Sequence, residues 1–105
     1  MRRGEIWWAV LPEPTGRRPV LLLSRNEAYA VRELVTIAPV TTRIRDLPSE
    51  IRLGTAERLP RSCVANLDVI TTIPRKCLRE RISALTATKA RELDEAILFA
   101  LGLRP

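Results

Sequence analysis

The sequence of 105 residues contains no histidine, and several other residue types are scarce. Without histidine the chain cannot build a Ser-His-Asp or Cys-His catalytic group or use imidazole as an acid or base. Its two cysteines, Cys63 and Cys77, lack a Cys-x-x-Cys spacing, so zinc would need carboxylates to complete its ligands. We therefore expect no metal and no cofactor. Aromatic residues make up only 4% of the chain, which leaves little for an extended base-stacking platform.

Long apolar runs are also missing, although hydrophobic residues make up 46% of the chain. No run approaches the roughly 20 apolar residues that a membrane-spanning helix needs. The residues that follow Met1 lack the apolar core of a signal peptide. The length is typical of one domain, so we expect a single soluble domain over residues 1–105, located in the cytoplasm.

Arginine is the residue that the chain has in excess. Eighteen basic residues against 12 acidic ones give a net charge of +6, and sixteen of the 18 are arginine. The guanidinium group pairs bidentately with phosphate and stacks on bases, so this excess favours a nucleic-acid partner. A genome rich in G and C would explain the ratio of arginine to lysine equally well, but it does not explain the net charge.

Short apolar segments separated by turn residues predict a sheet of short strands. The expected strands are 5–11, 20–23, 34–40, 50–53, 62–70 and 80–85, with a helical turn at 27–32 and loops at 54–61 and 71–78. Apolar residues then recur at three- and four-residue steps after Thr86, which can cap a helix that ends at Gly102. Such a chain is mainly β with appended helices (α+β), and we expect a small barrel-like sheet.

Four local expectations follow from the same pattern. Alternation along 5–11 makes Trp8 the core residue and leaves Trp7 nearer the surface, either as a base-stacking platform or as a packing residue. Pro39 indicates that its strand lies at a sheet edge or bulge. Cys63 lies in an apolar run and is expected in the core, whereas Leu98 and Phe99 widen the apolar stripe of the last helix, as if to meet another subunit.

Two basic segments lie at the ends of neighbouring strands. Arg17 and Arg18 precede the apolar run that starts at Val20, and Pro19 holds Arg18 in extended geometry. Thr41, Thr42, Arg43 and Arg45 follow the apolar run 34–40. We predict that these two segments meet and form a binding site for RNA phosphate.

Taken in order, these segments resemble the MazF/PemK family of toxin endoribonucleases. The resemblance rests on Arg3-Gly4-Glu5-Ile6-Trp7-Trp8, on residues 17–24, on Ala38-Pro39-Val40-Thr41-Thr42 and on Leu67-Asp68, and it covers essentially the whole chain. It implies an SH3-like barrel with a C-terminal helix, a homodimer, and metal-independent cleavage of single-stranded RNA at short specific sequences. It also implies inhibition by a cognate MazE-like antitoxin.

The resemblance places the family's catalytic pair on Arg18 and Thr41. The candidate RNA-binding residues are Arg17, Ser24, Thr42, Arg43, Arg45 and Trp7. Arg18 suits the stabilisation of a charged transition state, whereas the base that removes the 2′ proton stays open between a carboxylate such as Glu13 and water. Asn66 and Asp68 are expected to organise the fold, and for Ser24 a hydrogen bond within its own turn is an equal alternative.

Two other functions compete with RNA cleavage. A non-enzymatic poison of the same fold, like the gyrase-binding CcdB toxins, would act on a protein through the C-terminal helix. A plain basic barrel would bind nucleic acid in a salt-sensitive way without cutting it.

Overall fold

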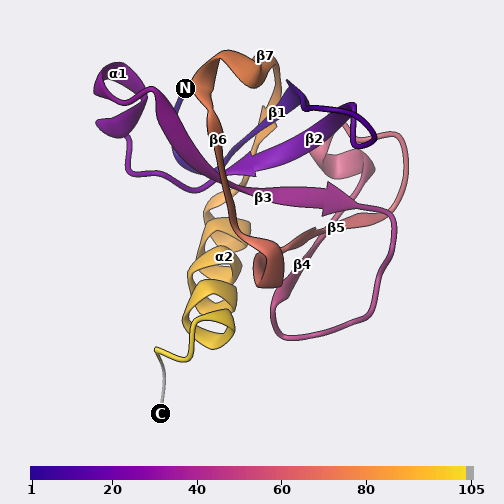
Figure 1. Cartoon of the computed structure of the whole chain (residues 1–105). Helices are drawn as coiled ribbons and strands as arrows, with labels where there is room; N and C mark the ends of the chain where they lie inside the picture. Colours follow the sequence, from indigo (N-terminus) through magenta and orange to yellow (C-terminus); the bar gives the residue numbers. More distant parts are fainter. Residues whose placement is uncertain (104–105) are drawn as a thin grey trace.

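Seven strands form one twisted sheet in the computed structural model, which describes residues 1–103 (Figure 1). The strands are β1 (Glu5–Val10), β2 (Arg17–Leu22), β3 (Leu34–Thr41), β4 (Glu50–Leu53), β5 (Cys63–Asn66), β6 (Thr71–Pro74) and β7 (Leu78–Ala84). They are ordered β4-β5-β3-β2-β1-β7, and β6 pairs with β3. The helices are α1 (Ala28–Val31) and α2 (Ala87–Ala100), with 3₁₀ turns η1 (Thr55–Glu57), η2 (Leu67–Val69) and η3 (Arg75–Cys77). The expected fold, mainly β with a C-terminal helix, is confirmed.

The sequence pattern was misleading in the second half of the sheet. The strand predicted over 62–70 ends at Asn66, whose side chain accepts the N–H of Asp68 at 2.9 Å and starts η2. The loop predicted over 71–78 is also wrong, because residues 71–74 form β6 against β3. Four residues that include a proline give little strand signal of their own, and the pairing with β3 decides their conformation.

β3 is the central strand, so of the two expectations for the end of the strand at Pro39, a sheet edge or a bulge, the sheet edge is wrong. One side of β3 pairs with β2, and the other side pairs first with β6 and then with β5. Pro39 falls at the changeover, after Ile37 pairs with Thr71 and before Val40 pairs with Ala65. The proline therefore lies outside both of the registers on that side.

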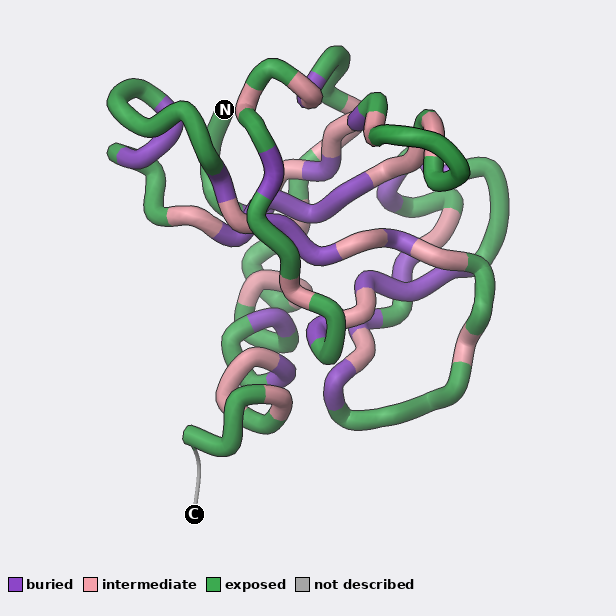
Figure 2. Tube along the Cα trace, viewed as in Figure 1, coloured by how far each residue is buried: buried purple, intermediate pink, exposed green. Residues whose placement is uncertain are grey.

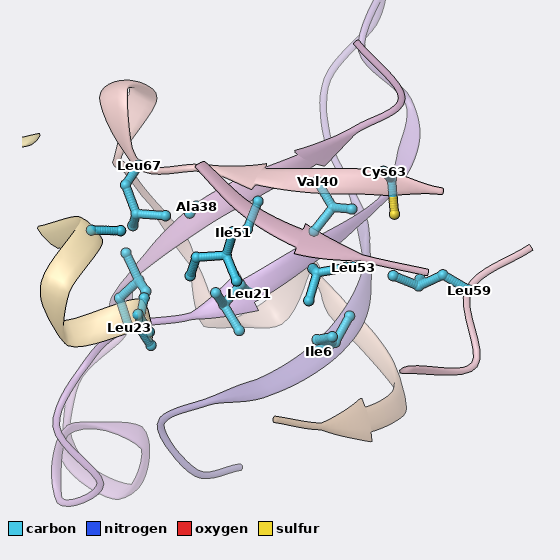
Figure 3. Close-up of a cluster of buried hydrophobic side chains, with 13 residues drawn as sticks. Ile6, Leu21, Leu23, Ala38, Val40, Ile51, Leu53, Leu59, Cys63 and Leu67 are labelled. Atoms are coloured by element: carbon cyan, nitrogen blue, oxygen red, sulfur yellow. The ribbon is translucent and has the colours of Figure 1, made fainter. Parts of the chain in front are cut away.

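β2 is buried on both faces over its second half, residues 20–22, and β3 is buried on both faces at its centre, as the purple segments of Figure 2 show. One face contributes to a first core, which also takes Leu93 and Ala96 from α2 (Figure 3). The opposite face contributes to a second core, which consists of Ala9, Val20, Leu22, Tyr29, Val35, Ile37, Ile73 and Leu78. Burial of each large aliphatic side chain stabilises the fold by roughly 1.5–3 kcal/mol. The two cores therefore hold the strands that carry the basic segments in a fixed relation.

The two tryptophans are placed differently from the prediction. Trp8 is only half-buried and belongs to neither core, so its assignment to the core is wrong. Trp7 is also half-buried, but it packs against the second core, and its indole N–H donates to Glu5 Oε1 at 3.0 Å. Cys63 lies in the first core, as expected.

α2 begins and ends as the sequence indicated. The hydroxyl of Thr86 accepts the N–H of Lys89 at 3.2 Å, and Gly102 takes the left-handed backbone conformation, with φ of +67°, just after the helix. Phe99 is 56% exposed beyond the first core, so the apolar end of α2 is uncovered in the single chain. Within residues 1–103, no helix has the length and apolar character needed to cross a membrane.

Candidate active site

The β2–β3 register brings Arg18 and Thr41 together. Val20 pairs with Pro39 and Leu21 with Ala38, and continuing this antiparallel register by two residues sets Arg18 opposite Thr41. Residues opposite each other in an antiparallel pair point to the same face, with Cβ atoms about 5 Å apart. Twenty-two residues lie between them in the sequence, so their proximity depends on the sheet and not on a local turn.

Arg18 and Thr41 line one small pocket with a volume of about 170 Å³, which we call the arginine pocket. Its walls are Arg18 of β2, Pro39 and Thr41 of β3, Arg43 and Arg45 of the β3–β4 loop, Asn66 at the end of β5 and Val69 of η2. Figure 1 shows this long loop leaving the end of β3 and sweeping around before it enters β4. The two basic segments therefore lie close together in the structure, as predicted.

The arginine pocket concentrates positive charge that other side chains do not neutralise. Among the residues that the structure describes, Arg18, Arg43 and Arg45 take part in no ion pair. No carboxylate lines this pocket within residues 1–103. Three guanidinium groups around one opening, beside a hydroxyl and an amide, form a site that suits an anion with several oxygen acceptors.

Thr41 and the β3–β4 loop are held by hydrogen bonds that leave their functional groups available. Thr41 Oγ1 accepts the backbone N–H of Arg43 at 3.2 Å, so the hydroxyl hydrogen can still be donated. Glu50 Oε1 accepts the backbone N–H of Arg45 at 3.0 Å. Because both bonds use backbone N–H donors, they fix the backbone of the loop at Arg43 and Arg45. The guanidinium groups of these two arginines take part in no ion pair among residues 1–103.

Asn66 lines the arginine pocket in addition to organising the fold. Its Oδ1 caps η2, as expected of a structural residue, and this leaves the amide NH₂ group as a donor at the pocket wall. Asp68 does not line the arginine pocket, and its Oδ2 accepts the hydroxyl of the buried Ser49 at 2.5 Å. A fold-organising role for Asn66 was expected from the sequence, but the proximity of Asn66 to Arg18 depends on the sheet order.

Arg17 lies on the other face of β2. Its guanidinium carbon is 4.7 Å from the centroid of the Trp8 ring, and its Nη2 is 3.6 Å from Glu80 Oε2. It does not line the arginine pocket. Alternation along a strand explains this separation of two neighbouring arginines.

Three further residues considered from the sequence do not line the arginine pocket. Ser24 lies six residues beyond Arg18, about 20 Å along an extended chain, and its hydroxyl accepts the N–H of Thr36 at 2.8 Å. Trp7 packs on the second core, and Glu13 is exposed on the loop between β1 and β2. This bond ties Ser24 to β3 and does not lie within the turn that follows Ser24, so it is not the turn-capping bond offered as the alternative.

A second pocket adjoins the arginine pocket through Thr41. It has a volume of about 150 Å³, and we call it the tryptophan pocket. Its walls are Trp8, Pro19, Val40, Thr41, Thr42, Leu59, Pro60, Arg61 and Cys63. Figure 3 shows Val40, Cys63 and Leu59 at one end of the first core. Burial, with the nearby Glu57 carboxylate, raises the pKa of the Cys63 thiol, so Cys63 acts here as a small apolar wall.

Carboxylates and thiols are scattered through the described chain and are not gathered into a metal site. Within residues 1–103, no three Cys, Asp or Glu side chains are placed so that they could hold a metal ion together. The chemistry available at the arginine pocket therefore consists of cationic hydrogen-bond donors, a hydroxyl and an amide.

Comparison with known proteins gives consistent results. The model of the family described as "PemK-like, MazF-like toxin of type II toxin-antitoxin system" matches residues 2–101. A Mycobacterium tuberculosis protein called "Probable endoribonuclease MazF2" is 40% identical over 104 residues, which cover 97% of this chain and 99% of the relative. The structure of M. tuberculosis toxin MazF-mt6 is similar with a TM-score of 0.88 at 34% identity, over 96% of this chain and 99% of the other. A mycobacterial endoribonuclease solved in complex with its cognate antitoxin has a TM-score of 0.86 at 25% identity, over 100% of this chain and 98% of the other.

Proposed function

Since this chain belongs to the PemK-like, MazF-like toxin family of type II toxin–antitoxin systems, we propose that it is a toxin endoribonuclease that cleaves single-stranded RNA at the arginine pocket. The observation that carries the proposal is the convergence of Arg18, Thr41 and two further unpaired arginines on one small opening. A basic surface alone would not need a hydroxyl and a guanidinium opposite each other on paired strands.

RNA carries its own nucleophile, the 2′-OH, so the protein has to orient the backbone and stabilise the charged phosphorane. In this mechanism Arg18 holds the non-bridging phosphate oxygens with its planar fork and, as a cation, assists the departing 5′-oxygen. Thr41 donates its hydroxyl hydrogen to the same phosphate. The 2′-oxygen attacks phosphorus as it loses its proton, the bond to the 5′-oxygen breaks, the 5′-oxygen takes up a proton from water, and a 2′,3′-cyclic phosphate remains on the upstream fragment.

Arg18 is unsuited to act as the base in this step. A guanidinium group carries only N–H donors and no lone pair that could accept the 2′ proton. No carboxylate lines the arginine pocket among residues 1–103, so we assign the 2′ proton to water. The step requires no metal ion, because the arginine side chains supply the positive charge.

The remaining residues of the two pockets have supporting roles. Arg43 and Arg45 bind the flanking phosphates, and Asn66 donates its amide hydrogens to the RNA. Arg17 contributes through the potential that it adds near Trp8 and makes no direct contact with the cleaved phosphate.

The proposal extends to partners and location. A cognate MazE-like antitoxin inhibits the enzyme by covering the basic groove, since a relative with a TM-score of 0.86 was solved in complex with its own antitoxin. The exposed apolar end of α2, with Phe99 56% and Leu101 57% exposed, packs against a second copy of the chain in a homodimer. The enzyme works in the cytoplasm, where its RNA substrates are.

Purified protein incubated with a long RNA tests the proposal. We expect cuts at a short recurrent sequence, with a cyclic phosphate on each upstream fragment, as determined by sequencing the new 5′ ends and analysing the 3′ ends. RNA that stays intact while the protein blocks DNA supercoiling would instead establish a gyrase poison. Salt-sensitive RNA binding without any cut would establish a plain binding module.

A further inference from the structure

The tryptophan pocket is the cavity that the proposed chemistry leaves without a role. It shares Thr41 with the arginine pocket, so the two openings meet at the residue that contacts the cleaved phosphate. A nucleotide whose phosphate lies against Thr41 on one side can place its base on the other side. Resting on the proposed function, we propose that the tryptophan pocket holds the unpaired base next to the cut, stacked on Trp8, and thereby sets the base preference at that position.

The walls of the tryptophan pocket suit a flat apolar ring. Val40, Leu59 and Cys63 are buried and form its floor, while Pro19 and Pro60 add rigid apolar edges. Its volume of about 150 Å³ is below the roughly 300–1,000 Å³ of pockets for drug-sized ligands. The pocket thus has the size and character for one ring system and not for a larger organic molecule.

Trp8 is prepared as a stacking surface by Arg17. The guanidinium of Arg17 lies 4.7 Å from the ring centroid, and its Nη2 is 3.6 Å from Glu80 Oε2. Stacking on an aromatic side chain is a general way to bind an unpaired base, and a cation over the ring adds to it. Trp8 lies outside both cores, although the alternation pattern assigned it to the core. This position makes its ring available to a ligand.

Polar groups at the rim provide a means of choosing among bases. Thr42 and Arg61 are both exposed at this pocket, and Arg61 takes part in no ion pair within residues 1–103. A hydroxyl and a guanidinium can bind the edge of a base whose face is stacked, which is how unpaired RNA bases are read. The apolar floor of the pocket contributes binding energy for any base, and the polar groups at its rim discriminate among the bases.

A matched pair of single-tryptophan variants tests the stacking directly. Trp7→Phe leaves Trp8 as the only indole, and Trp8→Phe leaves Trp7. The probe is a short RNA with the sequence that the wild-type enzyme cuts, made with 2′-deoxyribose at the cut so that it binds without cleavage. We expect the emission of Trp8 to fall at least two-fold on binding and the emission of Trp7 to stay constant. Unchanged Trp8 emission in a complex whose formation is shown by RNA anisotropy would overturn the proposal.

Cleavage profiling tests the discrimination and does not depend on fluorescence. We expect Arg61→Ala to relax the preference for the best base at one position beside the cut by about 10-fold and to leave the other positions unchanged. Arg79→Ala, which removes an exposed arginine on β7 outside both pockets, is the matched control. A profile unaltered by Arg61→Ala would overturn the role of the rim. A wild-type protein that cuts no RNA would reject the proposed function itself, so the two failures are distinguishable.

Discussion

Arg17 and Arg18 are neighbours in the sequence but lie in opposite environments on the two faces of β2. Arg17 is paired: it packs on the Trp8 ring and forms an ion pair with Glu80. Arg18 lines a pocket with Thr41 and two more arginines and has no ion-pair partner among the described residues. Both carry the same charge, so the difference lies entirely in what surrounds them. An arginine whose charge is already matched stabilises the protein, whereas one left unmatched in a pocket is available to a ligand.

Replacement of Arg18 should have the largest effect of any single change. Arg18→Ala removes the donor that we place on the cleaved phosphate, and we expect the rate of RNA cleavage to fall by about 10²–10³-fold. Arg18→Lys keeps the charge but loses the bidentate fork, so it should recover only part of the rate. Single-turnover cleavage of a labelled RNA measures this.

Arg79→Ala is the control for the loss of one positive charge and should cut at the wild-type rate. If Arg18→Ala, shown to be folded by circular dichroism, also cut at that rate, the contrast between the two arginines would have no functional meaning.

Arg43→Ala and Arg45→Ala should weaken RNA binding more than they slow the chemical step. Each removes one phosphate contact, so the slope of log affinity against log salt concentration should decrease by about 1 per variant. Binding to the uncleavable RNA, titrated at several salt concentrations, gives these slopes. Slopes equal to that of the wild type would place both arginines outside the RNA-binding surface.

Arg17→Ala should affect stability more than catalysis. The exposed ion pair and the contact with Trp8 together contribute about 1 kcal/mol, so urea unfolding should show a loss of that size or less. We expect the cleavage rate at saturating RNA to stay within about three-fold of the wild type. A rate loss as large as that of Arg18→Ala would show that the two faces of β2 are not functionally distinct.

Replacement of Glu5 should have the smallest effect on stability. This prediction tests only the hydrogen-bonded carboxylate near Trp7. Burial acts to raise the pKa of Glu5, but hydrogen bonds from Trp7 and Arg81 outweigh it, so the pKa is lowered from the usual 4.5. A lowered pKa adds stability above the unfolded-state value, and this stability is lost as the pH falls through the folded-state value. The free energy of unfolding, measured with urea between about pH 3 and pH 6, should therefore decrease less with falling pH for Glu5→Gln than for the wild type. An identical pH dependence would contradict the assignment.

The sequence predicted the residues of the arginine pocket better than it predicted the strands that form it. Arg18 and Thr41 could be found because Arg18 precedes one apolar run, Thr41 follows the next, and a family resemblance gave them a role. Residues 71–74 could not be assigned to a strand, since a four-residue segment ending in proline forms β6 only through its pairing with β3. The place of Trp8 was also out of reach, because alternation gives the face of a strand but not what covers that face.

The position of Asn66 beside Arg18 and the existence of the tryptophan pocket could be seen only in the three-dimensional structure. A fold-organising role for Asn66 was expected from the sequence, yet its position beside Arg18 follows from β5 pairing with β3. The tryptophan pocket joins β1, β3 and the loop around Pro60, which are distant in the sequence. The periodicity of apolar residues within one segment cannot predict which distant segments line a common pocket.

The most direct test of the central claim, that Arg18 and Thr41 act on one phosphate, is a double-mutant cycle on the cleavage rate. Single-turnover rates are measured for the wild type, Arg18→Ala, Thr41→Ala and the double variant, all confirmed as folded. Since groups that act on the same transition state are strongly coupled, we predict that the double variant is no more than a few-fold slower than the slower single variant. Losses that multiply, as they would for two independent sites, would contradict the claim.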